Sequence, residues 1–171
     1  MPADSILQHE IGYFRIYKDP KGIHYIQTRS GAMCVPINAQ GDVLFIVEHA
    51  PAVGERILTL PAGGIDQGES AETAANREMQ EELGYKAIHL NFLGVLHPWT
   101  KYLEATIHIF LARELGPSKL EGDEYEVIGT FHYPLNDFET LIQQGRLVDS
   151  TTIAALYMTR SFILKQSQNT P

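Results

Sequence analysis

The spacing of apolar residues predicts strands in the first third of the chain. Four short stretches are alternating or continuously apolar, as strands are, at residues 13–17, 23–28, 32–37 and 43–50. The turn signals "DPKG" and "NAQGD" separate them in pairs. We therefore expect two β-hairpins here.

After a Gly-rich loop, the spacing changes to that of a helix. Ser70 is a suitable N-cap and Gly84 a suitable C-terminal stop, so we expect a helix between them. Further strands are expected at 87–96, 104–114 and 126–134, followed by helices at 136–144 and 150–165. Strands on both sides of a central helix, with helices at the end, predict an α/β fold in which helices cover a sheet.

The central helix carries three glutamates within "REMQEEL", residues 77–83. On a helical wheel Glu78 and Glu82 fall inside the apolar arc, so they point toward the protein or into a cleft in it. Two carboxylates about 6 Å apart repel by roughly 3 kcal/mol at an effective dielectric constant near 20. Arg77 alone cannot neutralise three anions, whereas Mg²⁺ is held by one or two carboxylates plus substrate phosphates. The alternative is that Glu81 and Glu82 only make the helix soluble.

Length and charge limit the partners that we expect. The 171 residues suit one domain, residues 1–171. The net charge of −8 argues against a nucleic-acid or acidic-membrane partner. No apolar run approaches the roughly 18 residues of a membrane span, and no secretory signal is visible. The single cysteine, Cys34, forbids an internal disulfide, so we expect a cytoplasmic protein. The charge and the lack of a long apolar run lead us to expect no nucleic-acid or membrane partner.

The loop before the helix adds a fixed spacing to the glutamates. Gly63 is followed by five residues and Glu69, then by seven residues and the stretch from 77 to Gly84. This pattern resembles the Nudix box, the signature of the Nudix hydrolase family, with Tyr85 at a final position that is usually aliphatic. The resemblance implies an α/β/α sandwich with a mixed sheet. It also implies hydrolysis of a nucleoside diphosphate linked to another moiety, with Mg²⁺, or alternatively Mn²⁺, as cofactor.

The resemblance assigns metal-binding roles by position. Glu78 and Glu82 would hold the metal, with the carbonyl of Ala62 as a further ligand. Glu81 would be a ligand or a close support of the ligands.

The resemblance also assigns positioning and catalytic roles. Arg77 would orient the glutamates by salt bridges, and Glu69 would fix the loop and helix or reach the metal through water. A loop before the last strand carries the glutamate proposed as general base in the family. By position this is Glu124, with Glu126 as its neighbour and rival.

Two longer segments resemble the ADP-ribose pyrophosphatase branch of the family. They are "LTLPAGGIDQGESAETAANRE" and the region from "LEGDEYE" to "YMTR", and the subgroup that hydrolyses assorted ADP-linked compounds is especially similar. The resemblance implies a small nucleotide substrate, ADP-ribose or a related compound, cleaved to AMP and a phosphorylated partner. The alternatives are a pyrophosphatase for another nucleoside diphosphate derivative, such as a nucleotide sugar, dinucleotide or nucleoside triphosphate, and a non-catalytic nucleotide-sensing module.

The chain departs from this branch at two positions. Ala50 stands where an arginine often grips phosphate, and Thr59 where glutamate is usual. Arg29 and Arg56 are candidates to bind substrate instead.

The domain organisation follows from the same resemblance. Residues 31–165 are expected to form the Nudix core, and residues 1–30 to form strands that are exchanged between the subunits of a homodimer.

Overall fold

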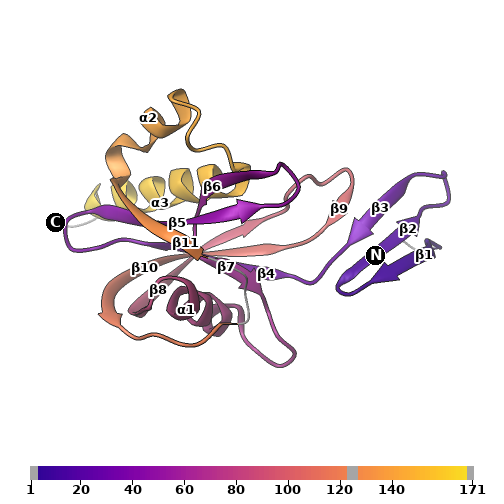
Figure 1. The fold of residues 1–171 in the computed structure, drawn as a ribbon, viewed down its shortest axis with the longest axis horizontal. Coiled ribbons are helices and arrows are strands. Elements are labelled where there is room, and N and C mark those ends of the chain that lie inside the picture. Colours follow the sequence, from indigo (N-terminus) through magenta and orange to yellow (C-terminus); the bar gives the residue numbers. More distant parts are fainter. Residues whose placement is uncertain (1–3, 123–126, 169–171) are drawn as a thin grey trace.

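The structure is a computed structural model that describes residues 4–122 and 127–168. Its elements are labelled in Figure 1 and follow the chain in this order: β1 (Ile6–Ile11), β2 (Phe14–Lys18), β3 (His24–Gln27), β4 (Gly31–Pro36), β5 (Asp42–Ala50), β6 (Glu55–Thr59), β7 (Ala62–Gly64), α1 (Ala71–Glu82), β8 (Tyr85–Leu96), β9 (Leu103–Glu104), β10 (Ile107–Pro117), β11 (Val127–Pro134), the 3₁₀ turn η1 (Leu135–Asp137), α2 (Phe138–Gln143) and α3 (Ser150–Gln168).

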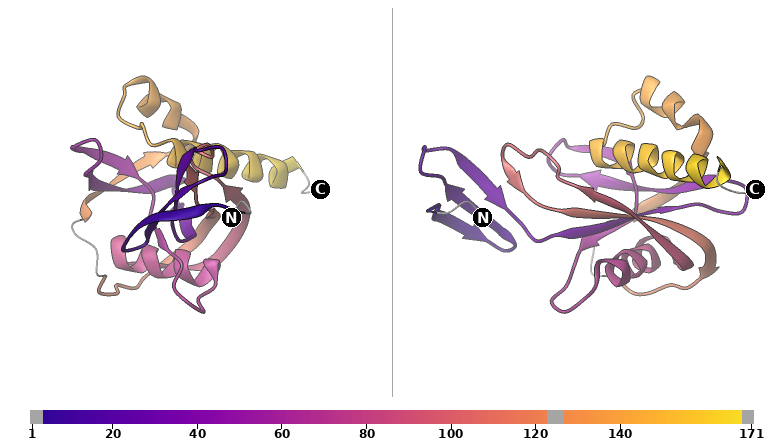
Figure 2. Two further views of the ribbon diagram at one scale, coloured as in Figure 1. Left: turned by 90° about the vertical axis from the view of Figure 1, so that its right-hand side faces the viewer. Right: turned by 180° about the vertical axis from the view of Figure 1, so that it is seen from behind.

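Two sheets lie between helices, which confirms the expected α/β/α arrangement. One sheet has the strand order β7-β4-β10-β8 and is mixed, because β10 runs parallel to β4 while the other pairs are antiparallel. The other has the order β11-β5-β6 and is antiparallel. Helix α1 lies on one side of the strands, and α2 and α3 lie on the other (Figures 1 and 2).

Strand β4 shows how the layers are joined. All six of its residues are buried, because both faces of this strand are covered. Ala32 and Cys34 belong to the apolar cluster under α1, whereas Met33 and Val35 belong to the larger cluster that includes residues of β5 and α3. Since neighbouring side chains of a strand point to opposite faces, one strand contributes to both cores.

One of the two predicted hairpins is wrong. The turn at "NAQGD" forms, with Asn38 Oδ1 accepting hydrogen bonds from the backbone of Gln40 and Asp42. Beyond it, β4 and β5 share only the bridge between Ile37 and Val43 and then enter different sheets. The physical reason is that β4 buries both faces, so it takes its neighbours from β7 and β10, which complete a covered sheet.

The N-terminal strands form a separate small sheet. The hairpin predicted at "DPKG" is confirmed as β2 and β3, and β1, which the apolar spacing did not predict, adds to the edge of β2. The sheet is completed by β9 and extends away from the layered body (Figures 1 and 2). Every residue of β1 is exposed.

The remaining predictions concern helices and long strands, and they are confirmed to within a few residues. The central helix begins after Ser70, whose side chain accepts a hydrogen bond from the Thr73 backbone, and it ends before Gly84, which has a φ of 74°. The short strands β6, β7 and β9 were not predicted. In the part of the chain described, no helix is both long and apolar enough to cross a membrane.

Candidate active site

The carboxylates of α1 are buried, as the helical wheel predicts. Glu78 is 3% exposed and Glu82 is 6% exposed, and both lie on the helix face that carries Ala74, Ala75 and Met79. Burying a charged carboxylate is costly unless cations or hydrogen-bond donors compensate it. The contacts around these two side chains therefore define the site.

Arg77 connects the helix to the loop that precedes it. Its guanidinium donates to both carboxylate oxygens of Glu69, at 3.0 and 3.1 Å. It also donates to Glu78 at 2.7 Å, to Glu81 at 3.1 Å and to the carbonyl oxygen of Gly64 at 2.9 Å. One planar side chain thus fixes three glutamates and the loop backbone, a geometry that the five donors of arginine allow and lysine does not.

This network shifts the titration of its members. Hydrogen bonding to Arg77 holds the pKa of Glu69 below its usual range, and the same bonds raise the pKa of Arg77. Glu69 additionally accepts from the backbone of Asp66 at 3.1 Å, which closes the loop onto the helix. The arrangement agrees with the positioning roles expected for Arg77 and Glu69.

Strand β7 approaches the carboxylates from the other side. The backbone N–H of Ala62 donates to Glu82 at 3.2 Å. At Gly63 there is no room for a side chain, because an added Cβ would collide with the carboxylate of Glu78. The pairing of β7 with β4 holds these backbone atoms in place. The structure thus brings Ala62, Glu78 and Glu82 close together, and their role as metal ligands stays a prediction.

The donor set fits a hard divalent cation. The charge of the two glutamates also affects the nearby Cys34. Burial raises the pKa of the Cys34 thiol, and the negative charges of Glu82 and Glu78 raise it further. Carboxylate and carbonyl oxygens are the ligands that Mg²⁺ prefers. Among the described residues no group of three or more acidic, histidine or cysteine side chains could hold a metal ion, so a cation here would depend on Glu78, Glu82 and backbone oxygen.

A groove of about 380 Å³ lies beside β7. We call it the box groove; its lining includes Ala62, Gly63, Gly64, Arg29 and Tyr13. The Arg29 guanidinium lies 3.9 Å from the centre of the Tyr13 ring and 3.3 Å from the carboxylate of Asp66. Arg29 also lies against Gly64, which follows the glycine that packs against Glu78.

The structure places Arg56 elsewhere. Arg56 lines a separate pocket of about 300 Å³ together with Arg146. The two arginine candidates thus lie in different cavities, and only Arg29 lines the box groove.

The segment after β10 is fastened to the C-terminal end of α1. Ser118 donates from its hydroxyl to the Gln80 side chain at 2.9 Å, and Lys119 donates to the backbone carbonyl of Glu81. Gly122 packs against the Glu81 side chain, where an added Cβ would lie 3.1 Å from the nearest atom. Glu124 and Glu126 lie outside the described residues.

The sequence assigned no role to several residues of this region. Asp66 holds Arg29, and Asp149 and Thr151, at the start of α3, line the box groove. Thr59 lines it too and shares a buried hydrogen bond of 3.1 Å with Thr152. No spacing in the sequence indicates these contacts, because they join segments that are far apart in the chain.

Comparison with known proteins agrees with this geometry. Residues 27–156 match the NUDIX domain. The chain belongs to the Nudix family. The ADP compounds hydrolase NudE of Escherichia coli (strain K12) is 31% identical over 162 residues, which cover 95% of this chain and 84% of that protein. An ADP-ribose pyrophosphatase of Bacillus subtilis (strain 168) is 29% identical over 129 residues, covering 74% and 70%.

A solved structure gives the same result. The crystal structure of an ADP compounds hydrolase superposes with a TM-score of 0.81 at 28% identity, covering 96% of this chain and 94% of the other. Family membership and these hydrolase relatives identify the chain as an enzyme, a Nudix pyrophosphatase.

Proposed function

We propose that this enzyme hydrolyses the diphosphate bond of ADP-ribose and related ADP-linked compounds, releasing AMP and a phosphorylated partner, with Mg²⁺ as cofactor and Mn²⁺ as an alternative. The observation that carries the proposal is the pair of buried carboxylates, Glu78 and Glu82, enclosed by Arg77 and the backbone of β7. The names of the relatives supply the substrate class.

The residues nearest the expected cation have different roles. Glu78, Glu82 and the Ala62 carbonyl would hold the cation, which lowers the pKa of the attacking water and offsets the charge of the diphosphate. Arg77 keeps Glu78 and Glu81 in position by its hydrogen bonds. Glu81 would be a further ligand or a close support of the ligands, and its bond to Arg77 is one that Glu78 also makes.

The outer residues orient the loop and the substrate. Glu69 holds Arg77 from the loop side. Arg29 lies at the box groove with a positive charge, so it would contact a substrate phosphate. Arg56 would act only on a part of the substrate that reaches the neighbouring pocket.

We further propose Glu124 as the general base, with Glu126 as its rival. The support is that Gly122, two residues before Glu124, packs against Glu81. Since a general base typically contributes 10²–10⁴-fold, Glu124→Gln should lower kcat by at least about tenfold. A smaller loss would direct the search to Glu126 or to a box glutamate.

The experiment is to incubate the purified protein with ADP-ribose and Mg²⁺ and to separate the products by chromatography. We expect AMP and ribose 5-phosphate in equal amounts, and no product when EDTA is present. Glu82→Gln should abolish turnover, whereas Glu72→Gln, which removes an exposed carboxylate from the same helix, should not. Failure to cleave any compound in a broad panel of nucleoside diphosphate derivatives, with metal present, would refute the proposed hydrolase activity.

A homodimer is part of the proposal. The N-terminal sheet exposes large apolar side chains, among them Ile6 at 65%, Ile11 at 72% and Phe14 at 53%. Exposed apolar surface of this kind marks interaction sites, and a second copy would cover it. Sedimentation of the full chain should give twice the monomer mass, and Ile11→Asp with Phe14→Asp should give the monomer mass.

The cellular setting and the domain boundaries also remain proposals. We propose a single domain with its Nudix core at 31–165, acting on small nucleotides in the cytoplasm.

A further inference from the structure

A pocket of about 300 Å³ lies beside the hairpin of β5 and β6, and it shares no lining residue with the box groove. We call it the arginine pocket, because Arg56 of β6 and Arg146, which follows α2, both line it. The apolar side chains of Val47, Leu58 and Val148 line it as well. The pocket therefore combines two cations from separate parts of the chain with an apolar wall.

The two cations of the arginine pocket are not neutralised by the protein. Within residues 4–122 and 127–168, neither guanidinium forms an ion pair or a side-chain hydrogen bond. Arg15, Arg77 and Arg160, by contrast, each have a carboxylate oxygen within 3.0 Å. Two unpaired guanidiniums at one cavity, in a chain of net charge −8, favour an anionic ligand.

The strand positions explain why Arg56 faces the end of α2. Leu58 is two residues further along β6 and pairs with Val47 of β5, so these side chains share one sheet face with Arg56. Leu58 and Leu141 of α2 belong to one apolar cluster, which places α2 on that face. Glu55 also lines the pocket, but as the neighbour of Arg56 on the strand it points to the opposite face.

Arg146 is held in place before any ligand binds. Its backbone N–H donates to the carbonyl oxygen of Leu141 at 2.9 Å, and Gly145, with a φ of 69°, turns the chain at the end of α2. The Arg146 guanidinium lies over the Phe131 ring, 4.8 Å from its centre. Because the backbone and the guanidinium are both held, little conformational freedom is left to be lost when a ligand binds.

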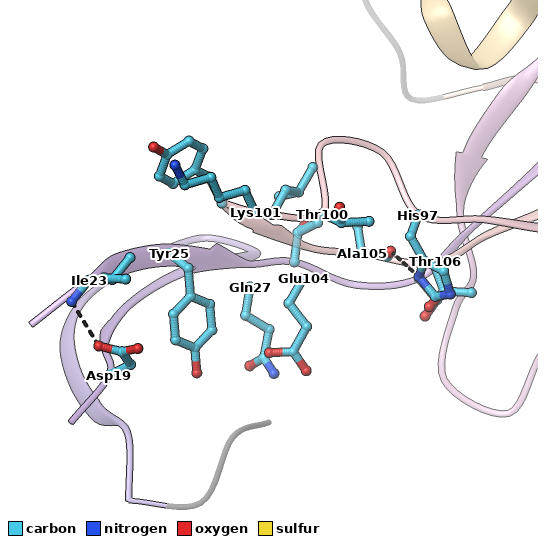
Figure 3. Close-up of a pocket in the computed structure, with 14 residues that line it drawn as sticks. Asp19, Ile23, Tyr25, Gln27, His97, Thr100, Lys101, Glu104, Ala105 and Thr106 are labelled. Carbon is cyan, nitrogen blue, oxygen red and sulfur yellow. Dashed lines mark hydrogen bonds between the residues drawn. The ribbon is translucent and has the colours of Figure 1, made fainter. Parts of the chain in front are cut away.

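The cavity drawn in Figure 3 is less suited to an anion. It has a volume of about 730 Å³, lies between β3 and residues 97–106, and is lined by Tyr25, Gln27 and Glu104 among others. Its second carboxylate, Asp19, already accepts two backbone hydrogen bonds, at 2.9 and 2.8 Å. Because two carboxylates disfavour an anionic ligand, the arginine pocket is the better of these two cavities for a phosphate.

The chemistry and the size of the arginine pocket fit a small phosphomonoester. Guanidiniums bind phosphate through pairs of parallel hydrogen bonds. A phosphomonoester carries a charge of about −1.5 to −2 near neutral pH, which two arginines offset. A volume of about 300 Å³ is at the lower end of the range for small-molecule sites, so the ligand is a small molecule.

We propose that the arginine pocket is a second anion site, which binds the phosphate group of a small phosphomonoester and is separate from the site that holds the diphosphate to be cleaved. Arg56 and Arg146 donate to the phosphate oxygens. The apolar wall formed by Val47 and Val148 contacts the organic group.

The first measurement uses phosphate without substrate. Inorganic phosphate is titrated into the full chain in metal-free buffer by calorimetry, because without a cation the buried glutamates of the box repel phosphate. Wild type should bind phosphate. Arg56→Gln and Arg146→Gln should each bind it at least about tenfold more weakly, since each loses hydrogen bonds to a charged group. Both side chains are exposed, so both variants should fold.

The matched control is Arg15→Gln, which also removes one arginine, but one that is already paired with Glu10 at 2.7 Å. It should bind phosphate as wild type does. No binding by wild type, or equal binding by wild type and the two pocket variants, would overturn the inference.

The second measurement separates the arginine pocket from the substrate site, and it alone rests on the proposed function. Without added phosphate, Arg146→Gln should leave the KM for ADP-ribose unchanged, because the two cavities share no lining residue. A KM raised as strongly as phosphate binding is weakened would overturn the separate site, because the pocket would then hold a phosphate of the substrate. If wild type does not cleave ADP-ribose, the proposed function fails, whereas the phosphate titration still decides whether the arginine pocket binds an anion.

Discussion

Gly63 lies against the carboxylate of Glu78, so replacing it by alanine displaces one expected metal ligand without changing any charge. The Cβ of alanine would lie within 3.0 Å of all three carboxylate atoms, and Oε2, the farthest of them, would be only 2.6 Å away. Ordinary contact begins near 3.4 Å, so even this oxygen must retreat by about 0.8 Å and the others by more. Glu78 is 3% exposed and bonded to Arg77 at 2.7 Å, so it has little free space to move into.

A shift of this size should lower the reaction rate strongly and the free energy of unfolding only slightly. A misplacement of about 1 Å costs roughly 10²-fold in rate, so Gly63→Ala should lower kcat/KM for ADP-ribose by about that factor. The free energy of unfolding should fall by no more than about 2 kcal/mol, since overpacking costs about 1–3 kcal/mol and alanine recovers part of this through the unfolded state. The assay is AMP release across a Mg²⁺ titration, together with urea denaturation.

The control is Gly116→Ala in β10, where an added Cβ meets no atom within 4 Å. This variant should keep both activity and stability. If Gly63→Ala retained kcat/KM within about threefold of Gly116→Ala, the position of the Glu78 carboxylate would not matter to the reaction, and the reasoning would be refuted.

Three further predictions concern the same network and its surroundings. Arg77→Lys keeps the charge but loses the planar set of donors to Glu69, Glu78 and Glu81, so kcat/KM should fall by at least about tenfold; steady-state kinetics with unchanged activity would contradict this. Because Arg77 lowers the pKa of Glu69, the folded state gains stability above the usual carboxyl pKa and loses it as the pH falls through the lowered one. Urea denaturation should therefore show a difference between wild type and Glu69→Gln that is constant near neutral pH and shrinks below about pH 4.5, and a pH-independent difference would refute the coupling. Thr152→Val breaks the buried bond to Thr59 and should cost about 1–3 kcal/mol, whereas adding Thr59→Val should recover part of the loss; a double variant less stable than Thr152→Val would contradict this.

Particular elements show which features could be predicted from the sequence. The central helix, its N-cap at Ser70 and its end before Gly84 are confirmed, because they depend on residues within one or two turns of each other. The burial of Glu78 and Glu82 is confirmed for the same reason. Strand pairing was harder: the turn after β4 formed, but its partners came from residues 62–64 and 107–112.

In the candidate site, too, contacts within one element could be predicted and contacts between distant segments could not. The ion pair of Arg77 with Glu81 joins residues four apart on a single helix and follows from its geometry. The approach of Arg29 to Asp66, the separate location of Arg56 and the grouping of Tyr25, Gln27 and Glu104 do not. Each of these depends on where a strand or loop from another part of the chain is placed.

The sequence by itself determined the helix, the inward direction of its glutamates and the spacing of the loop that carries Gly63 and Glu69. The period of a helix is a local property, so a few residues suffice to specify which side chains share a face. Only the tertiary structure decided that β7 packs against Glu78, that Arg29 reaches the box groove and that a second pocket, lined by Tyr25, Gln27 and Glu104, shares Thr28 with that groove. These contacts join residues brought together by sheet order, and sheet order is set by the burial of whole strands rather than by any local spacing.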